Sequence, residues 1–243
     1  MTQQEWLIDE ATSPDAADLE QMESELSPKL QSRGLESVSQ PQAINLAVRL
    51  QDIMIWDSKK WFGDAEMRLD ALVVRGHGTE GEPTSFYMPQ TFRFPGIKSR
   101  DRLPTGENGL LIFYGEALHF LDVFITVSRD RKDSEDLATL LNQKLQSKDI
   151  QGAVGTLLGL ATVAAPQVTT VTTALSAASF LGNLAYQVLS KVTGDTIGLY
   201  RNSWLQYRDG FGIGRHPQAG SHHVRDLSFW YEIIREEAED HSR

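Results

Sequence analysis

The sequence predicts a mainly β protein, an antiparallel β-sandwich interrupted by an inserted α-helical hairpin. Short segments in which apolar and polar residues alternate recur between residues 43 and 234, with turn residues between them. This pattern is typical of a sandwich. One stretch breaks it: residues 150–190 contain no Asp, Glu, Lys, Arg or His, although 23% of the whole chain is charged. We therefore expect one β domain that carries a hydrophobic insertion.

The predicted strands follow one another along most of the chain. The pattern is strongest at residues 65–74 and 120–127, where β-branched and aromatic residues are frequent, and such residues favour strands. Seven or eight strands are expected in all, over residues 44–56, 65–74, 85–88, 91–94, 110–114, 120–127, 197–204 and 227–234.

The insertion is expected to span residues 134–193 and to form two helices. Ser134 is suited to cap the first helix, because its hydroxyl can accept a backbone N–H bond and acidic residues follow it. Pro166 can start the second helix and Gly194 can end it. Each arm of the uncharged region, residues 150–190, is about 20 residues long, roughly the length that spans a bilayer. Its Thr, Ser and Gln content, with a mean hydropathy of −0.32 for the chain, favours burial against protein.

Two charged tails flank the predicted domain, which spans residues 43–234. Residues 1–42 carry nine acidic and two basic residues, a net charge of −7, and residues 235–243 are also acidic. The first tail has too little apolar surface to offset the entropy of ordering, so we expect it to be disordered. A formal net charge of −10 argues against nucleic acid as a partner, because that function needs clustered cations.

Composition also indicates the cellular compartment. The chain has no cysteine, which excludes disulfides, thiolate catalysis and cysteine-based zinc sites. The first residues lack the basic patch and apolar run of a secretory signal. We expect a cytoplasmic protein that can also associate peripherally with a membrane surface.

Two loops of the predicted sandwich are acidic. Asp57 and Asp64 bracket the loop after the first strand, and Asp130 follows the strand that ends at Val127. Asp195 comes directly after the insertion. Calcium takes six to eight oxygen ligands, and carboxylates that converge from neighbouring loops can supply them. Aspartates at strand ends also make ordinary turns with no ligand.

The chain resembles a C2 domain at these loops. The segments Gly63-Asp64-Ala65, Thr126-Val127-Ser128-Arg129-Asp130 and Asp195-Thr196-Ile197-Gly198 are similar to the loop closure, the D-x-D loop entry and the D-x-I-G turn of that family. The resemblance implies a calcium site formed by Asp57, Asp64, Asp130 and Asp195. Ser128 replaces the first Asp of D-x-D, and the insertion splits the second loop. Asp136 is an alternative closing ligand, at the spacing of an unsplit loop.

No catalytic motif is present, so we expect a protein that is not an enzyme. The residues expected to contact a membrane or a partner lie in the first acidic loop and in the insertion: Trp61, Phe62, Leu157, Leu158, Val171 and Leu175. Indole rings favour the headgroup region of a bilayer. We therefore predict a C2-like binding module, calcium-regulated, that engages a membrane or protein surface through its helical insertion. The alternative is an assembly protein whose uncharged helices mediate oligomerisation and whose acidic tail recruits a partner.

Overall fold

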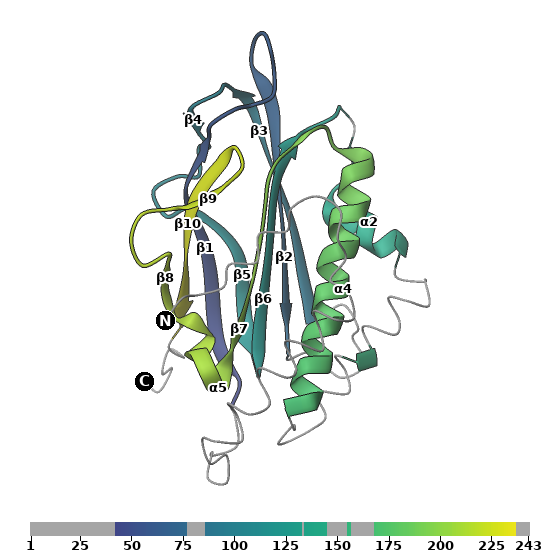
Figure 1. Cartoon of the computed structure of the whole chain (residues 1–243), viewed down its shortest axis with the longest axis vertical. Coiled ribbons are helices and arrows are strands. Elements are labelled where there is room, and N and C mark those ends of the chain that lie inside the picture. The colour runs from purple at the N-terminus through teal and green to yellow at the C-terminus, as the bar shows by residue number, and fades with distance from the viewer. Residues whose placement is uncertain (1–41, 77–85, 133, 145–154, 157–167, 237–243) are drawn as a thin grey trace, which may run out of the picture.

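The computed structural model describes residues 42–76, 86–132, 134–144, 155–156 and 168–236. Within these residues the chain is mainly β, as predicted, with two antiparallel sheets and two long helical segments (Figure 1). Leu157, Leu158 and Pro166, which the sequence singled out, lie outside the described residues, as do residues 1–41 and 237–243 of the two charged tails.

The first sheet, here called sheet A, is built around its central strands β1 (Ile44–Ile55) and β10 (Leu227–Arg235), which pair with each other. Strands β4 (Asp101–Arg102) and β5 (Leu110–Ala117) also pair with β1. Strands β8 (Gly214–His216) and β9 (His222–Val224) pair with β10. The three short strands β4, β8 and β9 are too brief for an alternating pattern to be recognised in the sequence.

The second sheet, sheet B, has the strand order β3-β2-β6-β7. Its strands are β2 (Ala65–Arg75), β3 (Tyr87–Ile97), β6 (Phe120–Arg129) and β7 (Thr196–Leu205). The sequence predicted two separate strands over 85–94, whereas β3 is continuous through Pro89. Proline is tolerated there because β3 is an edge strand of the described sheet, paired only with β2.

One apolar core lies between the sheets. Alternate residues of β1 and β10, such as Val48 and Phe229, point into it and meet Leu69 of β2 and Val123 of β6. Side chains alternate between the two faces of a strand, so the remaining residues of sheet B point to the other side.

A second apolar core lies on that other face of sheet B, under helices α2 (Leu137–Lys144) and α4 (Val168–Val192). Figure 1 shows both helices on the side of sheet B away from sheet A. The core combines residues of the sheet and of the helices: Leu72, Val74, Phe120, Phe124, Leu137, Leu140, Leu141, Ala178, Leu181, Ala185, Val188 and Leu189. Strands β2 and β6 are therefore buried on both faces.

The start of the first helix differs from the prediction. Helix α2 begins at Leu137, and the Ser134 hydroxyl is engaged by Arg68 and Asp130 instead of capping it. The hydroxyl of Thr91 accepts from the backbone N–H of Leu137 at the start of the helix instead. After β7 a short helix α5 (Gln206–Asp209) and a 3₁₀ turn η3 (Gly210–Gly212), neither of them predicted, lead to β8.

Candidate functional site

The structure places the loops that carry the four predicted calcium ligands at one end of the two sheets, the upper end in Figure 1. We call this end the tip and define it by residues 56–64, 97–102, 129–136 and 193–195. The Arg129 side chain joins these loops: its guanidinium donates to the carbonyl oxygen of Lys59 at 3.2 Å and to the Asp195 carboxylate at 3.0 Å. Grouping at one end is what the sequence predicted.

Each of these carboxylates is nevertheless engaged by a cation of the protein. The Lys59 ammonium contacts Asp57 at 3.1 Å and Asp226 at 2.5 Å. Hydrogen bonds from the Lys59 backbone and ammonium lower the pKa of Asp57, and the bond to Asp226 raises the pKa of Lys59.

The three other carboxylates, those of Asp64, Asp130 and Asp195, are also paired with basic side chains. Lys98 lies 3.6 Å from Asp64. Arg93 donates to Asp130 at 2.9 Å, and Arg129 holds Asp195. The four carboxylates are therefore held in separate ion pairs with basic side chains and do not converge as free ligands.

These contacts do not fit a calcium ion. The carboxylate oxygens that would coordinate calcium are paired with four basic side chains, Lys59, Arg93, Lys98 and Arg129. A bound calcium ion would have to displace these side chains. Among the residues that the structure describes, no group of three or more His, Asp or Glu side chains is arranged to hold a metal. The calcium site is thus a prediction from the sequence that these contacts do not support, and calcium titration tests it.

The loop that joins β1 to β2 is anchored at its start. Ser58 is buried, and its backbone N–H and hydroxyl both contact the Ser99 hydroxyl, at 3.0 and 3.2 Å. Lys59 adopts a left-handed conformation with φ of 54°, and the Lys60 ammonium donates to the carbonyl oxygen of Asp64 across the loop. These contacts hold the next residues away from the body of the protein.

Trp61 and Phe62 form the exposed end of this loop. Their side chains are 89% and 80% exposed, and their ring centroids are 6.2 Å apart in an edge-to-face arrangement. Exposed apolar side chains that lie together form a patch, and such patches often mark interaction sites. The sequence-based expectation of a loop-tip position fits this geometry.

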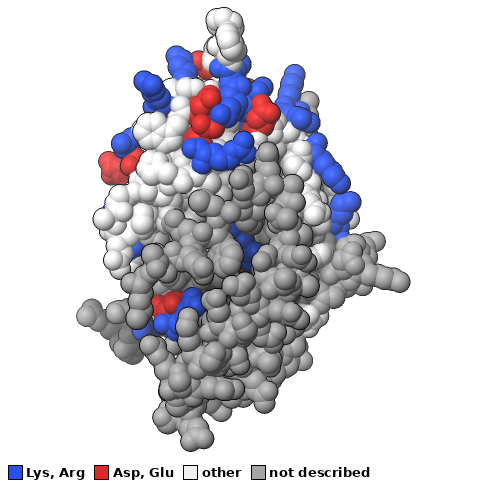
Figure 2. All heavy atoms as spheres, viewed as in Figure 1, with Lys and Arg blue, Asp and Glu red and all other residues white. Residues whose placement is uncertain are grey.

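Basic side chains gather around the aromatic pair. Figure 2 shows Lys and Arg residues concentrated at the end of the molecule where the tip loops lie, with acidic residues between them. Among the described residues, Arg100, Arg131 and Lys132 make no ion pair. All three side chains are exposed.

The predicted contact residues of the insertion are only partly placed. Val171 and Leu175 lie in α4, but their side chains are not described. Leu181 and Val188, which follow later in the same helix, face sheet B and are buried. No helix in the described part of the chain has both the length and the apolarity needed to cross a membrane.

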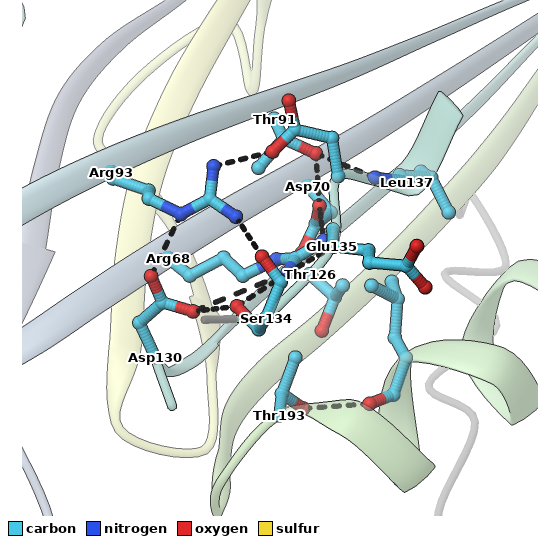
Figure 3. Close-up of polar contacts among 12 residues, drawn as sticks. Arg68, Asp70, Thr91, Arg93, Thr126, Asp130, Ser134, Glu135, Leu137 and Thr193 are labelled. Atoms are coloured by element: carbon cyan, nitrogen blue, oxygen red, sulfur yellow. Dashed lines mark hydrogen bonds and ion pairs between the residues drawn. The ribbon is translucent and has the colours of Figure 1, made fainter. Parts of the chain in front are cut away.

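A buried polar network fastens the start of the insertion to sheet B (Figure 3). Arg68 is fully buried and donates to both carboxylate oxygens of Asp70, at 2.6 and 2.8 Å. It also donates to the Ser134 hydroxyl and to the carbonyl oxygen of Glu135, at 3.0 and 2.7 Å. Burial raises the pKa of Asp70, although the neighbouring Arg68 opposes this shift.

Thr91 continues this network by donating to Asp70 at 2.6 Å and accepting from the backbone N–H of Leu137 at 2.9 Å. A second contact of the same kind fastens α4. Arg201 pairs with buried Asp122 and donates to the Ser179 hydroxyl of α4 at 2.6 Å. Sequence reasoning missed both contacts. Their one sequence signal is the presence of charged residues within strong strand patterns.

Comparisons with protein-family models, curated proteins and solved structures found no match to this chain. The resemblance to C2 domains therefore remains a prediction based on short motifs.

Proposed function

We propose that this protein is a non-enzymatic, C2-like binding module that attaches to anionic membrane surfaces through the tip, with Trp61 and Phe62 entering the headgroup region. The observation that carries the proposal is the exposure of these two side chains on an anchored loop among basic residues. Two antiparallel sheets that share a core, with the loops in question at one end, support the C2-like architecture.

Burial of the aromatic pair supplies the apolar part of the binding energy. Moving a large apolar side chain out of water contributes about 1.5–3 kcal/mol, so each residue is worth roughly a tenfold or larger change in partitioning. Edge-to-face packing of the two rings presents them as one unit. Because the loop is already anchored, little entropy is lost when they insert.

The cations supply the electrostatic part. Arg100, Arg131 and Lys132 can approach lipid phosphates while the paired acids stay neutralised by Lys59, Lys98 and Arg129. Each basic residue near an anionic membrane contributes about 1 kcal/mol. The basic side chains of the protein thus neutralise the acidic loops, which is the role that calcium would have in a calcium-dependent site. Membrane binding should therefore depend on the salt concentration more than on calcium.

The described part of the insertion has a structural role in this proposal. Its leucines fill the second core, and Arg68 and Arg201 hold its two arms on sheet B. Membrane contact through the insertion, as the sequence suggested, would require these buried contacts to break. The tip needs no such rearrangement.

Co-sedimentation with vesicles tests the proposal. The full chain should pellet with vesicles that contain phosphatidylserine and remain in solution with phosphatidylcholine alone. The double variant Trp61→Ala/Phe62→Ala should lose binding by about a hundredfold, from two contributions of roughly tenfold each.

Two control variants remove exposed apolar side chains elsewhere. Phe180→Ala changes α4, where Phe180 is 37% exposed, and Ile213→Ala changes the loop after η3. Both should bind as the parent does. Loss of binding in Phe180→Ala with retention in the double variant would show that the insertion makes the contact. No binding by the parent, together with self-association in analytical ultracentrifugation, would favour the assembly alternative.

A further inference from the structure

Sheet A has an outer face that no described helix covers. Helices α2 and α4 lie on sheet B, on the opposite side of the molecule (Figure 1). Since Leu46, Val48 and Leu50 of β1 point into the core, the alternation along the strand directs Ala47 and Arg49 outward.

Strand register places apolar and charged residues beside one another on this face. Arg49 has Leu111 of β5 on one side and Glu232 of β10 on the other. Ala47 has Tyr114 on one side. Leu111 is 44% and Tyr114 is 55% exposed, so the two form an apolar patch beside Arg49.

Arg49 lacks a partner within the described structure. Its Nε atom is shielded from solvent and donates to no acceptor among the described residues, although Glu232 is its cross-strand neighbour. A shielded donor without an acceptor costs free energy, and a carboxylate placed over the face would satisfy it.

The rest of the face is also suited to an acidic, apolar segment. Arg215 lies across from Glu232 and stacks over the Trp230 ring, with 4.5 Å between the guanidinium carbon and the ring centroid. Two arginines thus flank one glutamate. Tyr, Trp and Arg are the residues most often found at the centres of protein interfaces.

We propose that this face is the docking site of the chain's own N-terminal segment, residues 19–30. Its leucines and methionine cover Leu111 and Tyr114, and one of its glutamates accepts from Arg49. The segment has the required chemistry, because it combines Leu19, Met22, Leu26 and Leu30 with Glu20, Glu23 and Glu25. This inference is independent of the membrane proposal.

The chain also enters the described structure at the right place. Residue 42 precedes β1, and Ile44 pairs with Ala117 at one end of β5. From there to residue 26 are sixteen residues, which as a coil span about 20–24 Å on average. Strand β5 has eight residues, or about 27 Å of length. The segment can therefore reach the whole patch.

Photo-crosslinking in the full chain tests the docking. Tyr114→p-benzoylphenylalanine places a crosslinking group within the patch and keeps an aromatic ring there. Mass spectrometry of the digested monomer should find crosslinks to residues 19–30. The same group at Phe180, on α4, should give none to that segment.

A matched pair of substitutions tests the role of Arg49. Arg49→Gln should lower the crosslink yield by roughly tenfold, the scale of one charge-assisted hydrogen bond. Arg102→Gln makes the same charge change at the other end of β1, where β4 pairs with Met54, and should leave the yield unchanged. Thermal unfolding of both variants checks that each is folded. Crosslinked dimers, crosslinks only to other segments, or equal yields in the two variants would overturn the proposal.

Discussion

The backbone N–H of Gly194 donates to the carbonyl oxygen of Arg129 at 2.8 Å, and the N–H of Arg129 donates to the carbonyl oxygen of Asp195 at 3.0 Å. The chain therefore leaves sheet B after β6 and returns beside the same residue to begin β7. Strands β6 and β7 are thus paired although more than sixty residues separate them, and the closure of this connection depends on a close approach of two backbones.

Gly194 should be intolerant of a side chain. A Cβ atom there would lie 2.8 Å from the Arg129 Cβ and 3.2 Å from its carbonyl oxygen, so the strands would have to separate. We expect Gly194→Ala to lower stability by about 1–3 kcal/mol, measured by urea unfolding. Gly155→Ala is the matched control, because a Cβ there meets nothing within 4 Å, and it should be neutral or slightly stabilising. Equal effects of the two substitutions would contradict this account of the closure.

The buried Arg68–Asp70 pair should be sensitive to removal of one partner. Arg68→Met leaves the Asp70 carboxylate buried without its cation, and the expected loss of stability is about 3–5 kcal/mol. Arg68→Met/Asp70→Leu removes both charges and should recover much of that loss. Arg93→Met is the comparison within the same network: its side chain is 40% exposed although its partner Asp130 is buried, so its loss should cost less than that of the fully buried Arg68. A double variant as unstable as the single one would argue against the charge explanation.

His216 should make stability depend on pH. Burial lowers the pKa of this histidine, whose ring lies 4.1 Å from Trp204 and 5.1 Å from Tyr231 between centroids. The unfolded chain therefore takes up the proton at a higher pH than the native protein does. The resulting stability is fully present above about pH 6.5 and is lost as the pH falls through the lower native value.

The melting temperature should accordingly fall between pH 7.5 and 5.5, and His216→Gln should reduce the fall. His223→Gln, which changes an exposed histidine stacked on Trp56, is the control and should leave the pH profile unchanged. A profile that His216→Gln does not alter would show that other groups cause the dependence.

Calcium should have little effect on the protein. The carboxylates that the sequence indicated as ligands are held by Lys59, Lys98, Arg93 and Arg129. We expect millimolar calcium to leave the melting temperature unchanged, since a ligand that binds the native state would raise it. A rise that magnesium does not reproduce and that Asp130→Asn abolishes would establish the calcium site that the C2 resemblance implies.

The sequence predicted the long strands, because their alternation reflects which face of each strand is buried. The uncharged stretch also indicated helices correctly for residues 168–190. Two features of the structure could not be predicted from the sequence. The ion pair between Arg129 and Asp195 at the tip, for example, joins residues 66 positions apart, and nothing in a local pattern reports such a pairing. The second core could not be separated from a membrane-facing surface, because leucines at helical spacing serve either purpose.

The depth of the tip in a bilayer is the most direct test of the central claim. Because the chain has no cysteine, Phe62→Cys and Phe180→Cys can each carry a single nitroxide label, with Trp61 retained as an anchor. Electron paramagnetic resonance with phosphatidylserine-containing vesicles compares the accessibility of each label to oxygen and to a water-soluble nickel complex. The account predicts that the label at position 62 gains oxygen accessibility and loses nickel accessibility, while the label at position 180 stays aqueous. Entry of position 180 alone, or no change at either position, would contradict it.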